Sequence, residues 1–245
     1  MQPESSTSPV MPAGQTQGPH ETLRRMSAAA NYNAWLLERS RPYLGQRVLD
    51  IGAGVGTLTD ALSSLCDSVV AAEPDPALVQ ALEQRFASAL NVTVVEADAA
   101  SIGRAEVPRP FDSIVCFNVL EHIPDDVGAV DVFRSELRPG GRLLLLVPAH
   151  PFLFGSLDRM LEHERRYAKP SLKDLLVQRG FAIDVLQYVN PVGALGWLVS
   201  GRIMRRQQIP QGPLRLFDRL VPVLRSLDKV HLPFGLSLWA AARRL

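Results

Sequence analysis

The fold is decided by the stretch VLDIGAGVGTLT, which runs from Val48 to Thr59. An apolar run contains Asp50, three glycines then alternate with other residues, and a helical pattern begins at Thr57. Glycine adopts the positive φ angles that a tight turn needs and lets backbone N–H groups approach a ligand closely. The stretch therefore predicts a strand, a glycine turn and a helix, the unit that forms a ligand pocket at the carboxyl end of the first strand in a doubly wound α/β sheet.

The spacing of the glycines and of the acidic residues after them narrows the choice of ligand. A dinucleotide-binding turn, G-x-G-x-x-G, would need a third glycine at position 57, where the chain has Thr57, so an NAD-dependent oxidoreductase is not expected. The second predicted strand, Ser68–Glu73, ends in a carboxylate 23 residues after Asp50, close to the offset of about 20 residues at which such a group meets ribose hydroxyls. Asp98 follows the third predicted strand, residues 92–96, and can accept a hydrogen bond from an adenine amino group.

Two further motifs follow in order. The strand predicted over Phe111–Phe117 runs into the segment NVLEH at residues 118–122, and the turn LRPGGR at residues 137–142 precedes an apolar strand. With the glycine turn, these motifs make residues 48–148 resemble the class I S-adenosylmethionine (SAM)-dependent methyltransferases of the small-molecule type. The resemblance implies SAM as the cofactor. It also implies cofactor contacts from Tyr32, Asp50, Gly52, Ala53, Gly54, Glu73, Pro74, Asp98, Ala99, Asn118, Val119 and His122.

The same resemblance and the alternation of strands and helices predict a doubly wound, Rossmann-like α/β fold with a seven-stranded sheet. The sheet is expected to be mostly parallel, with an antiparallel last strand at residues 234–242. Residues 1–20, rich in Pro, Ser, Gln and Gly, are expected to form a disordered tail, and residues 21–245 a single methyltransferase domain. Within that domain, residues 190–230 predict a helical pair inserted as a lid.

Candidate catalytic residues come from the histidines. Methyl transfer to a hydroxyl needs a group that removes the hydroxyl proton, and histidine has an unperturbed pKa near neutral pH. His163, between Asp158 and a basic-aromatic run, is the preferred candidate for this base, and His150 is the second. These residues lack a tight metal-ligand spacing, so no metal is expected. His122 belongs to the resembled motif and is expected on the cofactor side.

The composition describes the setting. Apolar and charged contents of 47% and 21% are those of a soluble globular chain, and two cysteines far apart, Cys66 and Cys116, favour a reducing, cytoplasmic compartment. Residues 190–245 carry nine Lys or Arg against two acids, and the insertion is also apolar around Trp197. This pattern favours an acceptor with a hydrophobic body and an acidic group, or a peripheral contact with a membrane surface. The sequence leaves open whether the chain forms a homodimer.

Three functions stay open at this point. The favoured function is methyl transfer to O, N or C of a small-molecule acceptor, such as a natural product or a lipid-like compound. A macromolecular acceptor is the first alternative, although residues 118–121 lack the Asn/Asp-Pro-Pro-aromatic form of base-amino methylases and the near-neutral charge does not favour nucleic acid. A non-catalytic interaction protein of the same fold is the second, but it would not need Asp50, Glu73 and Asp98 together.

Overall fold

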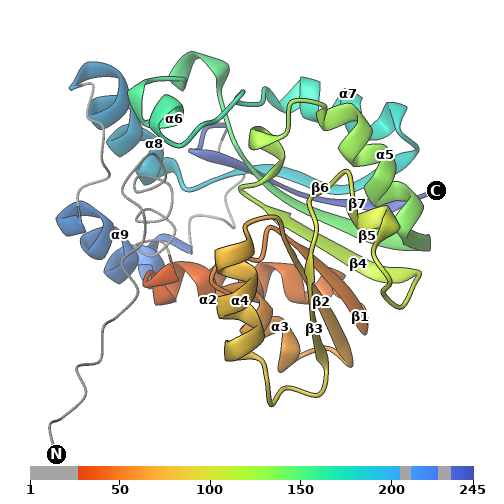
Figure 1. The fold of residues 1–245 in the computed structure, drawn as a ribbon. Coiled ribbons are helices and arrows are strands. Elements are labelled where there is room, and N and C mark those ends of the chain that lie inside the picture. Colours follow the sequence, from red (N-terminus) through yellow and green to blue (C-terminus); the bar gives the residue numbers. More distant parts are fainter. Residues whose placement is uncertain (1–26, 205–210, 226–232) are drawn as a thin grey trace, which may run out of the picture.

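The computed structural model describes residues 27–204, 211–225 and 233–245. In these residues a seven-stranded sheet is covered by helices on both faces, which gives three layers (Figure 1). The predicted tail at residues 1–20 lies outside the described residues. The proposed division into a tail, a single domain and a lid therefore stays a prediction.

The sheet has the order β3-β2-β1-β4-β5-β7-β6. Neighbouring strands from β3 to β5 are parallel, whereas β7 runs antiparallel to both β5 and β6. The predicted Rossmann-like sheet, mostly parallel with an antiparallel last strand, is confirmed, although that strand begins at Ser237 rather than at 234. The strands are β1 (Arg47–Ile51), β2 (Ser68–Glu73), β3 (Val92–Glu96), β4 (Phe111–Phe117), β5 (Leu137–Pro148), β6 (Phe181–Val189) and β7 (Ser237–Arg244).

Helices connect these strands and complete the outer layers. The longer ones are α2 (Ala30–Ser40), α3 (Thr57–Ser63), α4 (Pro76–Arg85), α5 (Asp126–Glu136), α6 (Ser156–Met160), α7 (Lys169–Gln178), α8 (Pro191–Trp197) and α9 (Gln211–Leu224). Short turns of 3₁₀-helix are η1 (Arg41–Tyr43), η2 (Ile102–Arg104), η3 (Leu120–His122) and η4 (Pro151–Leu153), and η5 (Leu198–Ile203) is a π-helical turn that continues α8.

Each face of the sheet has its own apolar core, because successive side chains of a strand point to opposite faces. Leu143 and Leu145 of β5 pack with residues of α5 and α7, whereas Leu144 and Leu146 pack with residues of α2 and α3. In Figure 1, α5 and α7 lie above the sheet and α2, α3 and α4 lie below it. These leucines are fully buried, so β5 contributes to the cores on both faces of the sheet.

The strand order also locates a crevice. The chain proceeds from β1 to β2 and β3 on one side and returns to β4 on the other side, so the order reverses between β1 and β4. In open α/β sheets, ligands bind outside the carboxyl ends of the strands at such a reversal. The segments that follow β1 to β4 all begin at this edge, and those after β5 and β6 begin at the same edge of the sheet.

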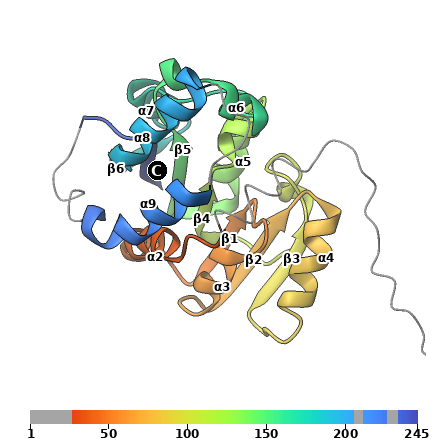
Figure 2. The ribbon, with the colours of Figure 1, turned by 90° about the vertical axis from the view of Figure 1, so that its left-hand side faces the viewer.

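The described part of the predicted insertion at residues 190–230 is helical and consists of α8, η5 and α9. α9 lies beside α2 (Figure 2), where Asp218 accepts hydrogen bonds from the Tyr32 backbone N–H at 2.9 Å and from Asn31 Nδ2 at 3.2 Å. Its action as a lid stays a prediction. Among the helices that the structure describes, each is too short or too polar to cross a bilayer.

Candidate functional site

The glycine turn after β1 is held open by its backbone. Gly52, Gly54 and Gly56 have φ angles of 72°, 58° and 80°, in the left-handed region that disfavours other residues. The N–H groups of Gly52 and Ala53 donate to the Ala72 carbonyl of β2 at 2.8 and 3.1 Å. A Cβ atom on Gly52 would lie 2.4 Å from Val119 Cγ2, so the turn passes directly under the segment after β4. The turn therefore has a shape that favours glycine, most strongly at Gly52, where a Cβ would also meet Val119.

Two buried carboxylates flank this turn. Glu73, 7% exposed at the end of β2, accepts hydrogen bonds from the Gly54 N–H at Oε2 (2.8 Å) and from the Asp75 N–H at Oε1 (3.2 Å). Asp50 accepts a hydrogen bond from Thr59 Oγ1 at 2.7 Å. Burial is the main cause that raises the pKa of Asp50 to about 6; the Thr59 hydrogen bond opposes this shift, and the nearby charge of Glu73 adds to it.

The segments after β3 and β4 supply exposed polar groups at the same edge. Asp98 Oδ1 accepts hydrogen bonds from the Ala100 N–H, the Ser101 N–H and Ser101 Oγ, and these lower the pKa of Asp98. This arrangement leaves Oδ2 for a ligand. Asn118 has a φ angle of 53°, and its N–H donates to the Leu146 carbonyl, which fixes the point where the chain turns away from β4.

The predicted cofactor residues thus lie at the carboxyl edge of the sheet, except for Tyr32 and His122. The residues in the last two positions of β1 and β2, or after the ends of β1, β2, β3 and β4, are Asp50, Gly52, Ala53, Gly54, Glu73, Pro74, Asp98, Ala99, Asn118 and Val119. Tyr32 lies on α2 beside α9, and His122 lies at the end of η3 next to His163. The role of each residue as a cofactor contact stays a prediction.

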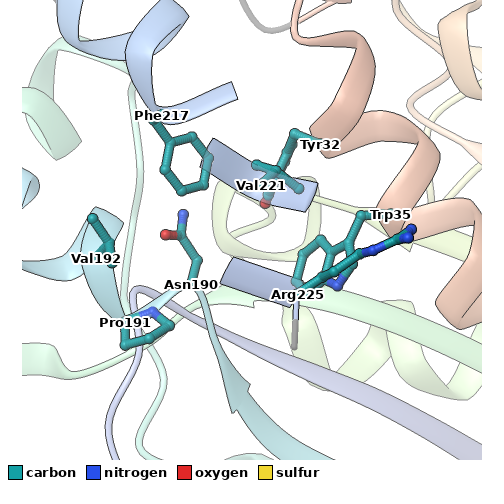
Figure 3. Close-up of a pocket in the computed structure, with 8 residues that line it drawn as sticks. All are labelled: Tyr32, Trp35, Asn190, Pro191, Val192, Phe217, Val221 and Arg225. Atoms are coloured by element: carbon teal, nitrogen blue, oxygen red, sulfur yellow. The ribbon is translucent and has the colours of Figure 1, made fainter. Parts of the chain in front are cut away.

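A pocket lies between α2, α9 and the start of α8 (Figure 3). Its walls are mainly apolar, with Asn190 and Arg225 as polar groups. Tyr32, buried to 5% exposure, packs against Phe217 with ring centroids 5.9 Å apart. The lining residues are Tyr32, Trp35, Asn190, Pro191, Val192, Phe217, Val221 and Arg225. Because Asn190 directly follows β6, the pocket opens at the same edge of the sheet as the glycine turn.

His150 lies two residues after the end of β5, at the same edge of the sheet. Its φ angle of 61° is unusual for a residue with a side chain, and its ring stacks on Tyr188 and on Phe234, each at 4.7 Å between centroids. Nε2 is buried and has no hydrogen-bond partner among the described residues. Burial lowers the pKa of His150, and the charge of Arg166 lowers it further, so the imidazole is neutral at neutral pH.

The segment between β5 and α7 is rich in polar residues, yet its central residues are buried. Asp158 is fully buried and accepts four hydrogen bonds, from the N–H of Gly155 (2.8 Å), His163 Nδ1 (3.0 Å), Arg166 Nε (2.6 Å) and Trp197 Nε1 (3.1 Å). The Arg166 side chain is 1% exposed. The polar residues of the segment therefore satisfy one another inside the fold, and His163 is held by Asp158.

The carboxylate of Glu121 was not singled out in the sequence analysis. Glu121 on η3 is 1% exposed, and neither carboxylate oxygen has a hydrogen-bond partner among the described residues. Burial raises the pKa of Glu121 to about 8, although the charge of Arg166 works against the shift. Burial also lowers the pKa of His122, which lies beside His163, to about 4. An acid within the apolar run VLEH was the available signal.

Comparisons with known proteins agree with this geometry. Residues 49–143 match the family model described as "Methyltransferase domain". A ubiquinone biosynthesis O-methyltransferase of Xylella fastidiosa is 32% identical over 127 residues, 52% of each chain. A SAM-dependent methyltransferase from Archaeoglobus fulgidus has a TM-score of 0.60 at 17% identity, covering 92% of this chain and 97% of that one. The N-methyltransferase NodS from Bradyrhizobium japonicum WM9, in complex with S-adenosylhomocysteine (SAH), gives 0.55 at 15%, covering 93% and 89%.

The coverage and the sequence identity of these matches limit what they establish about the chain. The chain spans about half the length of curated relatives such as this one. The solved structures have identities of 17% and 15%, so they establish the fold alone. The family match contains the glycine turn, both buried acids and the segments after β3 and β4, whereas the pocket and the helices of the insertion lie mostly outside it.

Proposed function

Because residues 49–143 match the methyltransferase-domain family model, we propose that the chain is an enzyme of the class I SAM-dependent type, which binds SAM and transfers its methyl group to a small-molecule acceptor. One observation carries the proposal above all: the buried carboxylate of Glu73 lies against the glycine turn, with Oε2 2.8 Å from the Gly54 nitrogen. A ligand with a ribose and a polar tail fits such a turn, and a bulky pyrophosphate is not required.

The residues at this edge fit SAM chemically. The Glu73 carboxylate can accept hydrogen bonds from both ribose hydroxyls, and Asp98 Oδ2 can accept one from the adenine amino group. The glycine turn has no side chain that would keep the amino-acid part of the cofactor away from the backbone. When bound, SAM supplies a methyl group on a positively charged sulfur, which an oxygen, nitrogen or carbon nucleophile can take up.

The acceptor is proposed to bind in the pocket between α2, α8 and α9. Apolar walls from Trp35, Phe217 and Val221 suit a hydrophobic body, and Arg225 at the rim suits an acidic group. Arg225 already pairs with Glu38 at 3.1 Å, and both side chains are half-exposed, so an acidic acceptor would have to exchange with this surface pair. The name of the Xylella fastidiosa relative supports oxygen as the accepting atom.

His150 is proposed as the group that removes the proton from an acceptor hydroxyl. It follows β5 at the carboxyl edge, and its ring is stacked on Tyr188, two residues before Asn190 of the pocket. Its buried Nε2 has no partner among the described residues and its lowered pKa keeps the ring neutral, so it can take up a proton. His163, the other candidate, already shares its Nδ1 with Asp158.

The proposal extends to the cellular compartment of the enzyme and to the contacts of its surface. Cys66 and Cys116 are buried free thiols, which is consistent with a cytoplasmic location. Exposed apolar side chains on α8 and α9, such as Leu195 and Leu220, support a peripheral contact with a membrane surface that delivers a hydrophobic acceptor. A homodimer is the other use of that surface, and sedimentation with and without lipid vesicles distinguishes the two.

Calorimetric titration with SAH tests the cofactor. We expect binding in the micromolar range and none of NAD. Glu73→Gln should weaken SAH binding by about 1–3 kcal/mol, or about 5- to 150-fold, because hydrogen bonds to a charged group are lost. Glu96→Gln is the matched control, since Glu96 is an exposed acid at the end of the neighbouring strand β3 and should change affinity less than about twofold. Equal losses in the two variants would contradict the proposed ribose contact.

A labelled methyl group tests the reaction. With methyl-labelled SAM and a panel of phenolic and carboxylate-bearing hydrophobic acceptors, the label should enter compounds that extract into organic solvent. Label in protein or nucleic acid would support the macromolecular alternative, and SAH binding without any transfer would support the non-catalytic one. His150→Gln should lower turnover by about 100-fold at unchanged SAH affinity, whereas loss of turnover only in His163→Gln would return the base to His163.

A further inference from the structure

Three side chains from two distant segments meet beside the carboxyl edge of β4. Each of Glu121, His122 and His163 offers one potential ligand atom, and these atoms all lie within 4.8 Å of one another. Glu121 and His122 belong to η3, directly after β4, whereas His163 lies after α6. The rings of His122 and His163 are arranged edge to face with their centroids 4.8 Å apart. No two of these groups are joined by a hydrogen bond in the described structure.

The two imidazoles are each oriented by a partner on the far side of the ring. His163 Nδ1 lies 3.0 Å from Asp158 Oδ1, and His122 Nδ1 lies 3.3 Å from the Glu162 carbonyl oxygen. Both partners are acceptors, so each Nδ1 carries the proton and each Nε2 carries the lone pair. A carboxylate or carbonyl behind an imidazole is the usual support of a metal-ligating histidine, because it fixes the tautomer and the ring direction.

The carboxylate of Glu121 provides the second, independent observation. It is 1% exposed, and neither oxygen has a hydrogen-bond partner among the described residues. A buried polar group without a partner is costly, and carboxylates in this position are usually paired or bound to a cation. The nearest cationic side chain in the network, Arg166, directs Nε to Asp158 and Nη1 to the Ala149 carbonyl instead.

We propose that Glu121, His122 and His163 bind a divalent first-row transition metal ion. Two imidazole nitrogens and one carboxylate are the ligand set of catalytic zinc sites and of the facial sites that hold iron, manganese or cobalt. This assignment replaces the expectation that no metal is bound, and it does not rest on the proposed methyl transfer.

The distances permit the site with a small adjustment. Ligand atoms around one zinc ion lie about 2.0–2.2 Å from the metal and so about 3–4 Å from one another. The 4.8 Å span of the three ligand atoms is wider than this, so a bound ion would draw them closer by about 1–2 Å. Glu121 is buried, His163 is intermediate and His122 is exposed, so the remaining coordination positions face the His122 side. Water or an oxygen of a ligand can bind there.

Metal binding would tie together two segments that border the cofactor edge. η3 follows Asn118 and Val119, whereas the segment of His163 follows His150. They already share a backbone hydrogen bond, from the Glu164 N–H to the Glu121 carbonyl at 2.9 Å. An ion would fix the segment after β4 against the segment after β5, and it would pair the Glu121 carboxylate, which has no hydrogen-bond partner among the described residues.

Titration of the purified, chelator-treated protein with Co²⁺ tests the proposal. We expect one equivalent to bind, with visible d–d absorption bands of a four- or five-coordinate site and a higher thermal midpoint. Glu121→Gln and His163→Gln should each weaken Co²⁺ binding by at least 100-fold. Glu164→Gln, an exposed acid in the same segment, is the matched control and should bind Co²⁺ as the wild type does.

The orienting residue gives a further readout. Asp158→Asn should weaken Co²⁺ binding by about 10- to 100-fold while His150→Gln leaves it unchanged. Circular dichroism of each variant identifies any that fails to fold, and Glu121→Gln, which is isosteric, keeps the test valid if the Asp158 variant is lost. Absence of Co²⁺ bands in the wild type, or the same loss in Glu164→Gln as in Glu121→Gln, would overturn the proposal. SAH titration in the presence of chelator separates this outcome from a failure of cofactor binding.

Discussion

Asp158→Asn should reduce the free energy of unfolding by about 3–5 kcal/mol. The magnitude follows from the four donors around the wild-type carboxylate: His163 Nδ1 and Arg166 Nε face Oδ1, and the Gly155 N–H and Trp197 Nε1 face Oδ2. An asparagine has one acceptor oxygen and one NH₂ group. Either orientation of the amide therefore points donors at two donors, and it also leaves the buried Arg166 guanidinium without a counter-charge.

Urea unfolding followed by circular dichroism and tryptophan fluorescence measures the loss. Asp60→Asn is the matched control, because Asp60 pairs with Arg85 at 3.2 Å with a side chain 63% exposed. We expect a change below about 0.5 kcal/mol there, since exposed pairs contribute little. A loss below about 1 kcal/mol in Asp158→Asn, or one equal to that of the control, would refute the view that Asp158 organises this segment.

The pH dependence of the same variant provides an independent check. Burial acts to raise the pKa of Asp158, but the His163 hydrogen bond and the charge of Arg166 outweigh it and leave the pKa below its usual value. A carboxyl group with a lowered folded-state pKa contributes stability above its unfolded pKa of about 3.9 and loses it as the pH falls. The difference between wild type and Asp158→Asn should therefore shrink below about pH 4, and a constant difference down to pH 3 would contradict the assignment.

Three other variants test the edge of the sheet. Gly52→Ala should cost about 1–3 kcal/mol and weaken SAH binding, because a Cβ at a φ of 72° lies 2.4 Å from Val119 Cγ2; calorimetry with unchanged affinity would contradict this. Asp50→Asn should gain about 3 kcal/mol of stability relative to wild type as the pH rises from about 4 to 6, because a folded-state pKa of about 6 means that the wild type loses stability over this range. Urea midpoints of the two proteins at pH 4 and pH 7 measure this gain. The same difference between the two proteins at both pH values would contradict the prediction. Asp218→Ala removes the carboxylate to which the Tyr32 N–H donates at 2.9 Å, and it should raise the KM for the methyl acceptor by about fivefold in initial-rate kinetics. An unchanged KM would mean that α9 does not take part in binding the methyl acceptor.

Much of the fold could be predicted because its signals are local. β2, β3 and β4 have the predicted ends, since each is an apolar run bounded by an acid or a proline. The glycine turn was equally accessible, because the positive φ angles of Gly52, Gly54 and Gly56 leave a sequence trace that no other residue leaves. The antiparallel last strand was predicted from the family resemblance, whereas its place between β5 and β6 was not predicted, since pairing order has no local signal.

The rest of the candidate site depends on contacts between distant residues. Asp158 reads as an ordinary surface acid until Trp197, 39 residues later, is seen to donate to it. His163 has the same character, because its contacts with Asp158 and His122 are made by the fold and decide whether it acts as a base or as a ligand. Glu121 could have been suspected from its apolar neighbours, but its unpaired oxygens are a property of the packed interior alone.

The position of β7 has a consequence for synthesis of the chain on the ribosome. β7 lies between β5 and β6, and residues 237–242 are all buried, yet it is made after both of its neighbours. Until Ser237–Arg244 has left the exit tunnel, β5 and β6 each expose a row of unpaired N–H and C=O groups that can pair with another chain. Nascent chains that pause before this point are therefore prone to aggregation and are natural clients of chaperones, whereas residues 47–117 can pair their four strands earlier.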